Sequence, residues 1–476
     1  MQFQSCGKIF LDAVISIIMA DVFRRKIYDK LVDWKNASSG SSAMLIEGAR
    51  RVGKTTVAEE FGRREYKSYL LIDFVNPLPG TIDVFEAYGH DIRMLLSNLS
   101  LIYGVKLYER KSLIIFDEVQ RYVRARELIK YFVMDGRYDY LETGSLISIK
   151  KNVEHIQIPS EEESIQMNPM DFEEWLWANG DQETYDVIRD HFANREPLGQ
   201  TMHGAIMRKY RTYMIVGGMP AAVAAFVNTH DISASERIKR QIVKLYREDM
   251  MKIPDGYGER ALAVFDRVPE MLSSHRKVFR PGTVEPGTAS DDYVESISWL
   301  CEAKVVNQCI SNSDPSPAMN MTNRSESVKL YILDTGLLMT IAFDVGNLDE
   351  SVFVDFARSR ISVNKGMLFE NAVAQSLVAA GTNLYFHEFY LDDDDKHIYE
   401  VDFILVRGPK IIPVEAKSSQ SNKHTSFDRF LEKFRKRIDE AFVVHTKDLR
   451  RDGKVTYVPV YMAQLLSIGA KGRPLN

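Results

Sequence analysis

The chain has 476 residues, of which 45% are hydrophobic and 27% charged, and its formal net charge is −5. These values exclude a disordered or low-complexity protein and leave room for two or three globular domains. A mildly negative chain carries no overall nucleic-acid signature, so any basic surface has to be local.

The cysteines and the apolar segments bear on the compartment. Three cysteines (Cys6, Cys301 and Cys309) are odd in number and lack metal-ligand spacing, which indicates a reducing compartment and therefore the cytoplasm. No apolar stretch reaches the ~18 residues that a membrane helix needs, so we expect no membrane partner.

The N-terminal stretch superficially resembles a signal peptide. Residues 9–20 are largely apolar and follow Lys8, but Asp12 interrupts the run and no small-residue cleavage site follows it. We therefore interpret residues 1–20 as a leader outside the fold, with Met19 as an alternative start.

The motif around which the chain is organised spans residues 44–56. An apolar strand ends before Gly48, and a helix opens at Gly53, Lys54 and Thr55. This is the G-x-x-x-x-G-K-[ST] phosphate loop in its strand, loop and helix context. The glycines let the backbone curl so that its N–H groups converge on the phosphates, Lys54 can bridge the β- and γ-phosphates, and Thr55 can ligate Mg²⁺. The alternative is a chance match in a glycine-rich loop.

Residues 112–120 supply the second half of such a site. Four apolar residues lead to Asp117 and Glu118, a pattern typical of a buried strand with carboxylates at its C-terminal edge. Asp117 would hold Mg²⁺ through its water shell or through Thr55, and Glu118 would orient the attacking water. The two motifs together predict a nucleotide triphosphatase that uses Mg²⁺.

Strands and helices alternate around these motifs. Strands are expected at 69–74, 112–117, 138–145 and 156–159, and helices at 22–35, 83–104 and 123–134. This predicts a parallel sheet with helices on both faces, in an ATPase core of residues 21–165. Thr143 and Ser145 end a sheet strand, where ligands of open α/β sheets bind. One of them could sense the γ-phosphate or hold the attacking water, and a plain turn at Gly144 is the alternative.

The chain then changes character twice. Residues 166–255 indicate a helical lid, with helices at 172–177, 183–194, 203–214 and 235–252 and a Gly-Gly interruption within 213–220. Residues 256–345 suggest a winged-helix-like module, with helices at 261–272 and 292–302, apolar segments at 304–310 and 329–334, and a polar wing at 311–327. Such a module can enter a DNA major groove or contact a protein. Its second helix has acidic residues and no basic one, which favours protein contact.

Residues 346–476 contain a second candidate site. A hairpin that turns at Gly408-Pro409 would place Asp402 opposite Glu415, and alternation puts Glu415 and Lys417 on one face. Two facing carboxylates beside a lysine can hold a divalent cation that acidifies a water, while Lys417 steadies that water or the scissile phosphate. The alternative is ordinary cross-strand charge pairing on an exposed hairpin.

Other features complicate this second site. Glu370 projects from a helix and could complete the metal shell, whereas Pro413 removes a ladder donor in mid-strand and puts the register in question. Residues 392–395 are four aspartates that would repel nucleic acid if they faced the site. Basic residues cluster at 433–437, which indicates either a phosphate-backbone patch or a solvated helix face.

These motifs together resemble a known group, the prokaryotic AAA-type ATPases that carry a C-terminal domain of unknown function with a nuclease-like fold. The resemblance covers the chain from about residue 21 and rests on segments 47–55, 116–120, 143–145, 216–220, 331–337 and 366–371 and on the 402–415 hairpin. It implies ATP as the nucleotide, bound by Gly48, Gly53, Lys54 and Thr55, with Asp117 and Glu118 in the roles given above. We expect further nucleotide contacts from the neighbouring loop residues and the end of the last strand, Arg50, Arg51, Val52, Thr56, Thr143 and Ser145.

The same resemblance extends to the C-terminal part, which looks like the PD-(D/E)XK nucleases. It implies Glu370, Asp402 and Glu415 as metal ligands, and Glu415 and Lys417 as catalytic residues beside Lys54 and Glu118 of the ATPase. An arginine finger could come from Arg50, Arg51 or Arg121.

The expected fold is α/β: a P-loop NTPase parallel sheet, a helical lid, a winged-helix-like module and a C-terminal restriction-endonuclease-like domain. We interpret the chain as an ATP-hydrolysing enzyme coupled to metal-dependent DNA cleavage or to DNA binding. The alternative is a regulatory ATPase whose C-terminal domain binds a protein or a nucleic acid without cutting, and a homo-oligomer is compatible with both. A small-molecule kinase is disfavoured because the Asp117–Glu118 pair suits water activation.

Overall fold

The computed structural model describes residues 22–144, 161–254, 256–274, 276–285, 287–344, 365–391, 394–418 and 425–467. The chain divides into two compact units, Met1–Met167 and Asn168–Asn476. The leader, Ser145, the strand expected at 156–159 and the start of the aspartate run lie outside the described residues. Within the described ranges, no helix is long and apolar enough to cross a membrane.

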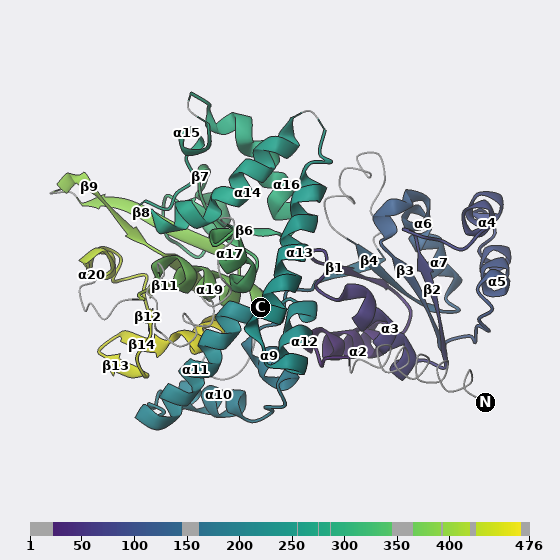
Figure 1. Ribbon diagram of the computed structural model, residues 1–476, viewed down its shortest axis with the longest axis horizontal. Helices are drawn as coiled ribbons and strands as arrows, with labels where there is room; N and C mark the ends of the chain where they lie inside the picture. The colour runs from purple at the N-terminus through teal and green to yellow at the C-terminus, as the bar shows by residue number, and fades with distance from the viewer. Residues whose placement is uncertain are drawn as a thin grey trace, which may run out of the picture. The chain divides into compact units, whose positions relative to one another are not determined.

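The first unit is built on a five-stranded sheet in the order β2-β3-β4-β1-β5, with every pairing parallel (Figure 1). Its strands are β1 (Ala43–Glu47), β2 (Ser68–Asp73), β3 (Ser112–Asp117), β4 (Asp139–Gly144) and β5 (Glu162–Gln166). Strand β3 is buried along its whole length, which is why it reads as one apolar run. The predicted parallel sheet of a P-loop NTPase is confirmed.

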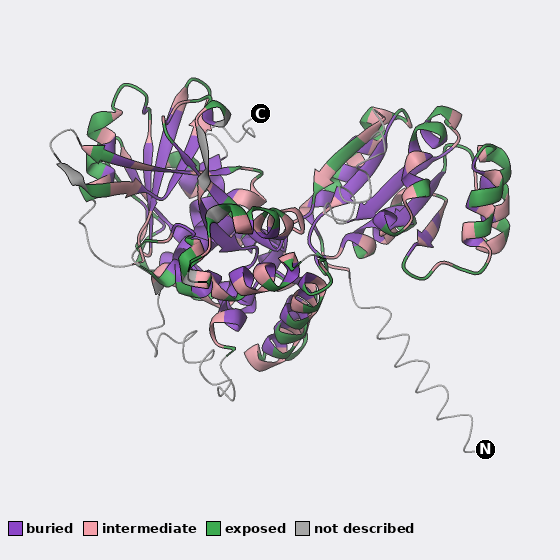
Figure 2. Ribbon diagram, turned by 90° about the horizontal axis from the view of Figure 1, so that it is seen from above, coloured by how far each residue is buried: buried purple, intermediate pink, exposed green. Residues whose placement is uncertain are grey.

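Helices pack around this sheet, and their outward faces are exposed (Figure 2). They are α2 (Lys26–Ser38), α3 (Lys54–Glu65), α4 (Thr81–Tyr88), α5 (Ile92–Ile102), α6 (Val123–Glu127) and α7 (Ile129–Asp135), with a 3-10 turn η1 (Val119–Arg121). The single helix expected at 123–134 is thus two helices that meet at Leu128. Strand β5 was not expected, because this edge strand is mostly polar and partly exposed.

The second unit begins with helices. These are α9 (Phe172–Ala178), α10 (Thr184–Asn194), α11 (Gln200–Val216), α12 (Pro220–Thr229), α13 (Ile232–Met250), α14 (Tyr257–Ser273), α15 (Pro281–Val284), η2 (Ser290–Tyr293), α16 (Val294–Glu302) and α17 (Thr335–Ala342). The sequence predicted most of them, but not α12, α15 or α17. Helix α12 opens on Pro220, where the Gly-Gly interruption ends. Proline suits this position because its missing N–H would have no partner in the first turn.

Two sheets complete the second unit (Figure 1). One has the order β7-β6-β8-β9, from β6 (Val306–Asn312), β7 (Asn323–Ile332), β8 (Leu384–Leu391) and β9 (Asp394–Val401). The other has the order β10-β11-β12-β14-β13, from β10 (Phe403–Arg407), β11 (Lys410–Ala416), β12 (Ala441–His445), β13 (Arg450–Asp452) and β14 (Val455–Pro459). The remaining elements are η3 (Met319–Met321), α19 (Lys365–Ala379), α20 (Thr425–Lys433) and η4 (Val460–Ser467).

The hairpin of β6 and β7 differs from the expected wing. Strand β6 pairs antiparallel with β7 and parallel with β8, so the hairpin shares its sheet with strands that we had assigned to a separate C-terminal domain. Residues 311–327, expected to be a polar wing, supply the end of β6 and the first half of β7.

The hairpin of β10 and β11 has the predicted register. Phe403 pairs with Val414 and Arg407 with Lys410, so the turn is Gly408-Pro409 and the residue before Phe403 falls opposite the residue after Val414. Gly408 has a φ of 53°, a left-handed conformation that glycine adopts without strain.

Pro413 lies in the middle of β11, where we expected a conflict with strand pairing. The N–H of Ile411 donates to the carbonyl of Arg437, and the ladder with β12 starts only at Val414. Every second N–H of a strand points to the same side, so Pro413 falls between the Ile411 hydrogen bond and the start of the β12 ladder. Its missing N–H therefore breaks no hydrogen bond of that ladder. The central strand therefore tolerates a proline.

Candidate functional site

The phosphate loop connects β1 to α3. Gly53 caps α3 with a φ of 97°, which residues with a Cβ rarely adopt. Gly48 has a different role, because a Cβ added there would lie 2.3 Å from the carbonyl oxygen of Met167. We expected both glycines to let the loop curl, whereas Gly48 instead allows the loop to pack against the chain that follows β5.

Lys54 and Thr55 form the first turn of α3. The Lys54 ammonium donates to the carbonyl oxygens of Gly48 and Ala49 at 3.0 and 3.1 Å, and its side chain is buried. Burial lowers the pKa of Lys54, and the nearby carboxylates of Glu118 and Asp117 oppose this effect. A buried ammonium held over the loop is placed to exchange carbonyl partners for phosphate oxygens.

The other predicted contacts of the loop differ in exposure. Arg50, Arg51 and Thr56 are exposed, as is Arg121, the third candidate for an arginine finger. Val52 is buried, and its carbonyl accepts a hydrogen bond of 2.9 Å from Arg25. The segment that precedes α2 is thereby tied to the phosphate loop.

Asp117 lies at the centre of a hydrogen-bond network at the end of the sheet. The Thr55 hydroxyl lies 2.8 and 3.0 Å from the two Asp117 carboxylate oxygens, and the Thr143 hydroxyl donates to the first of them. The Glu118 N–H donates to Thr143 Oγ1 at 3.1 Å. Thr143, one of the two hydroxyl residues that could sense the γ-phosphate or hold the attacking water, directs its hydroxyl to Asp117 and to the backbone of Glu118. The oxygen donors of Thr55 and Asp117 suit Mg²⁺.

Glu118 adopts a left-handed backbone conformation, with φ 50° and ψ 48°. Such conformations are uncommon outside glycine and gather at functional sites. The side-chain amide of Gln120 donates to the Glu118 carboxylate, and Gln120 is itself buried. Sequence reasoning missed Gln120, although it follows the acidic pair within the same motif.

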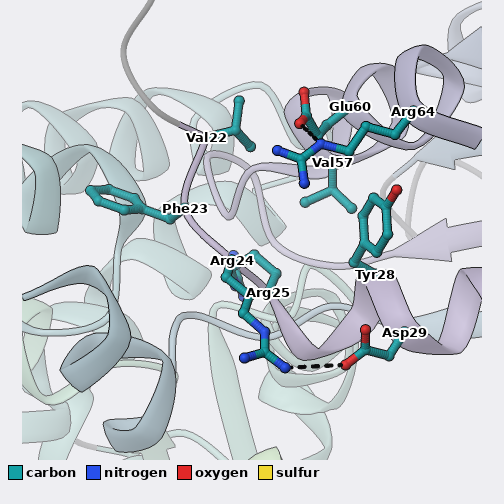
Figure 3. Close-up of a pocket in the computed structure, with 9 residues that line it drawn as sticks. All are labelled: Val22, Phe23, Arg24, Arg25, Tyr28, Asp29, Val57, Glu60 and Arg64. Carbon is teal, nitrogen blue, oxygen red and sulfur yellow. Dashed lines mark ion pairs between the residues drawn. The ribbon is translucent and has the colours of Figure 1, made fainter. Parts of the chain in front are cut away.

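A pocket of about 290 Å³ opens between helix α3 on one side and the start of α2 with the segment before it on the other (Figure 3). It is lined by Val22, Phe23, Arg24, Arg25, Tyr28, Asp29, Val57, Glu60 and Arg64. Val57, Glu60 and Arg64 come from α3, whose first turn carries Lys54. Pockets that hold small molecules start near this size, at about 300 Å³. The sequence offered no signal for the pocket beyond the amphipathic helix expected at 22–35.

The second candidate site lies where β10 and β11 meet. One Asp402 oxygen accepts a hydrogen bond of 2.8 Å from the Ala416 N–H, and Lys417 Nζ is 2.7 Å from Glu415 Oε1. Burial raises the pKa of Glu415 to about 8, helped by the Asp402 charge and opposed by Lys417. The structure therefore brings Asp402, Glu415 and Lys417 together as predicted.

Two lysines that we did not predict also enter this site. Lys329 of β7 has a fully buried side chain whose Nζ lies 2.5 Å from Glu400, 3.6 Å from Glu370 and 3.7 Å from Asp402. Lys277 forms an ion pair with Glu370, and the Tyr331 hydroxyl donates to the same carboxylate at 2.7 Å. We name this group, Lys277, Lys329, Tyr331, Glu370, Glu400, Asp402, Glu415 and Lys417, the acid–lysine cluster.

The pKa of Glu370 reflects these partners. Burial alone would raise it, but the charges of Lys329 and Lys277 and the hydrogen bonds from Lys277 and Tyr331 lower it to about 2. Glu370 is therefore a carboxylate that already has cationic partners. Among the described residues, no group of three or more His, Cys, Asp or Glu side chains is placed to hold a metal ion. The three acids of the expected metal shell, Glu370, Asp402 and Glu415, each lie beside a lysine ammonium group.

Comparison with protein families divides the chain into three matched stretches. Residues 8–176 match an AAA domain, residues 207–348 a domain of unknown function (DUF8612), and residues 365–462 another (DUF4143). The first match starts at residue 8 and so reaches into the stretch that we interpreted as a leader. No curated protein matches the chain.

Similar solved structures share little sequence with this chain. A signal transduction ATPase with numerous domains and a tetratricopeptide repeat sensor, from Pyrococcus horikoshii, is 11% identical, with a TM-score of 0.27 over 76% of this chain and 50% of its own. Cdc6p from Pyrobaculum aerophilum is 10% identical, with a TM-score of 0.27 over 73% and 98%. Drosophila ORC bound to DNA is 12% identical, with a TM-score of 0.24 over 68% and 95%.

The chain thus spans half the length of the first of these proteins, and the TM-scores are too low to establish a shared fold. The family match is stronger evidence for the type of domain, because the matched residues include the parallel sheet and both nucleotide motifs. Residues 8–176 carry an AAA-type P-loop ATPase domain.

Proposed function

We propose that the first unit binds ATP with Mg²⁺ and hydrolyses it, and that the second unit is a binding module regulated by the nucleotide. The observation that carries the first part is the network that joins Thr55, Asp117, Thr143 and Glu118 at the end of the sheet. When bound, Mg²⁺ supplies charge neutralisation at the β- and γ-phosphates. Thr55 and Asp117 would hold the ion, and Glu118 would take the proton of the attacking water.

The direct test is phosphate release from ATP by the full chain. We expect release in the presence of Mg²⁺ and none when EDTA removes the ion. Activity that survives EDTA would contradict a Thr55–Asp117 metal site. Absence of any release would overturn the hydrolytic proposal itself.

The pocket beside α3 is the proposed site of the nucleotide base. It adjoins the phosphate loop through the Arg25–Val52 hydrogen bond, and Phe23 and Val57 give it apolar surface. Aromatic stacking on a base contributes about 1–3 kcal/mol, so Phe23→Ala is expected to raise the Kd for ATP about tenfold. Inorganic tripolyphosphate has no base, and its affinity should not change.

Calorimetric titration of both ligands checks this assignment. Tyr131→Ala is the matched control, because Tyr131 is an exposed aromatic residue of the same unit that does not line the pocket. An equal loss of affinity for ATP and tripolyphosphate would instead mean that Phe23 supports the phosphate loop.

A second candidate function is metal-dependent DNA cleavage by the second unit. The proximity of Asp402, Glu415 and Lys417 favours it, whereas the lysines beside Glu370 favour a module that binds DNA or protein without cutting. Incubation with circular and linear DNA in Mg²⁺ or Mn²⁺, with and without ATP, separates the two. Cleavage by wild type and not by a Glu415→Ala, Lys417→Ala variant would establish the nuclease.

Free thiols at Cys301 and Cys309 suit the reducing cytoplasm, where we place the protein. DNA, a protein partner and a second copy of the chain remain the proposed partners of the second unit.

A further inference from the structure

We propose that Lys329 is the resident cation of the acid–lysine cluster, and that this cluster holds its carboxylates together without a divalent metal ion. The inference concerns the second unit alone and stands apart from ATP hydrolysis. It also departs from the metal site that the spacing of Asp402 and Glu415 predicts.

The position of Lys329 carries the inference. Its side chain has no exposed surface, and its ammonium lies among three carboxylates: Glu370 of α19, Glu400 of β9 and Asp402, which follows β9. A buried ammonium needs such partners, since an unpaired charge in the protein interior is strongly unfavourable. The ammonium thus lies 3.6 Å from Glu370 and 3.7 Å from Asp402, two of the three acids that were expected to bind the metal.

Most of the remaining carboxylate oxygens also have partners. Glu370 pairs with Lys277 and accepts the Tyr331 hydroxyl, and one Asp402 oxygen accepts the Ala416 N–H. One Glu415 oxygen pairs with Lys417, while the other is buried without a hydrogen-bond partner among the described residues. A divalent cation would have to displace these contacts and would also meet the repulsion of a fixed positive charge.

The cluster also joins residues from two modules that the sequence analysis treated as separate. Lys329 and Tyr331 come from β7, and their acidic partners come from α19, β9 and the residue after β9. Lys329 is thus an electrostatic link between the β6–β7 hairpin and the stretch that the sequence assigned to a nuclease-like domain.

The experiment is thermal unfolding and Mn²⁺ titration of the nucleotide-free full chain. We expect Asp402→Asn to leave Mn²⁺ binding unchanged from wild type, because the cluster of the wild-type protein binds no Mn²⁺. Lys329→Met should lower the melting temperature of the second unit by on the order of 10 °C, because it leaves buried carboxylates unpaired. Mn²⁺ should raise the melting temperature of that variant and not of wild type, since the variant lacks the fixed positive charge beside Glu400 and Asp402.

Lys244→Met is the matched control, because Lys244 is an exposed lysine in a loose surface pair of the same unit, and it should leave the melting temperature nearly unchanged. If Lys329→Met does not fold, the double variant Lys329→Met, Glu400→Gln should restore folding by removing one unpaired carboxylate. Asp402-dependent Mn²⁺ binding by wild type, or a Lys329→Met variant as stable as wild type, would overturn the proposal. Failure of the double variant to fold any better than Lys329→Met would overturn it as well.

Discussion

Lys54→Ala is expected to lower ATP turnover about 100-fold or more, because it removes a charge that faces the phosphates as negative charge develops. Lys54 is buried, and its ammonium is held by the carbonyls of Gly48 and Ala49. The loop itself, residues 48–53, contains no lysine that could replace it. Phosphate release and ATP affinity are the measurements, and both should fall.

The control for this variant is Lys111→Ala, since Lys111 is an exposed lysine just before β3, at the end of the strand opposite to Asp117. Its activity should match wild type. Glu118→Gln separates binding from chemistry: it should bind ATP with an affinity close to that of wild type and still turn over at least about 100-fold more slowly. A Lys54→Ala protein that hydrolyses ATP at the wild-type rate would show that the nucleotide site is elsewhere.

Much of the first unit follows from local sequence. The phosphate loop is one continuous segment, and the Asp117–Glu118 pair ends a strand that is apolar because it is buried on both faces. Parallel strands bring their carboxyl ends to one edge, so two motifs far apart along the chain can be placed together from spacing alone. The hairpin of β10 and β11 was predictable for a similar reason, because a two-residue turn fixes the register.

What the sequence did not predict depends on contacts between distant segments. Lys329 begins an apolar run and is typical of the solvated flank of a strand, yet its side chain is fully buried by acids from α19 and β9. Strand β5 escaped notice because its polar residues give no apolar run. The role of Gly48 is likewise set by Met167, which only the folded chain brings near.

The joint between α11 and α12 shows how a small-residue motif acts through distant contacts. Gly217 has a φ of 78°, and a Cβ on Gly336 would lie 2.7 Å from its Cα. The Gly218 N–H donates to Asp334 at 2.6 Å, and its carbonyl accepts from the Met170 N–H at 2.7 Å. Asp334 also caps α17, where it accepts the Leu337 N–H. The segment before α9, the joint and α17 are therefore joined through backbone groups that leave no space for a side chain.

Gly218→Ala is accordingly expected to destabilise the second unit by about 3 kcal/mol or more, at the upper end of overpacking effects. The added Cβ would lie 2.0 Å from the Met170 carbonyl oxygen, which is backbone and cannot rotate away. Gly204→Ala is the matched control in α11: its Cβ meets nothing nearer than an Arg208 side-chain nitrogen at 3.8 Å, and it should stabilise the helix by about 0.5–1 kcal/mol. Urea unfolding of the two variants measures both effects. The clash is with backbone, so it can be relieved only if Met170 moves and its hydrogen bond to Gly218 breaks. If the free energy of unfolding of Gly218→Ala lies within about 1 kcal/mol of the wild-type value, the backbone at this joint can shift at little cost, contrary to the prediction.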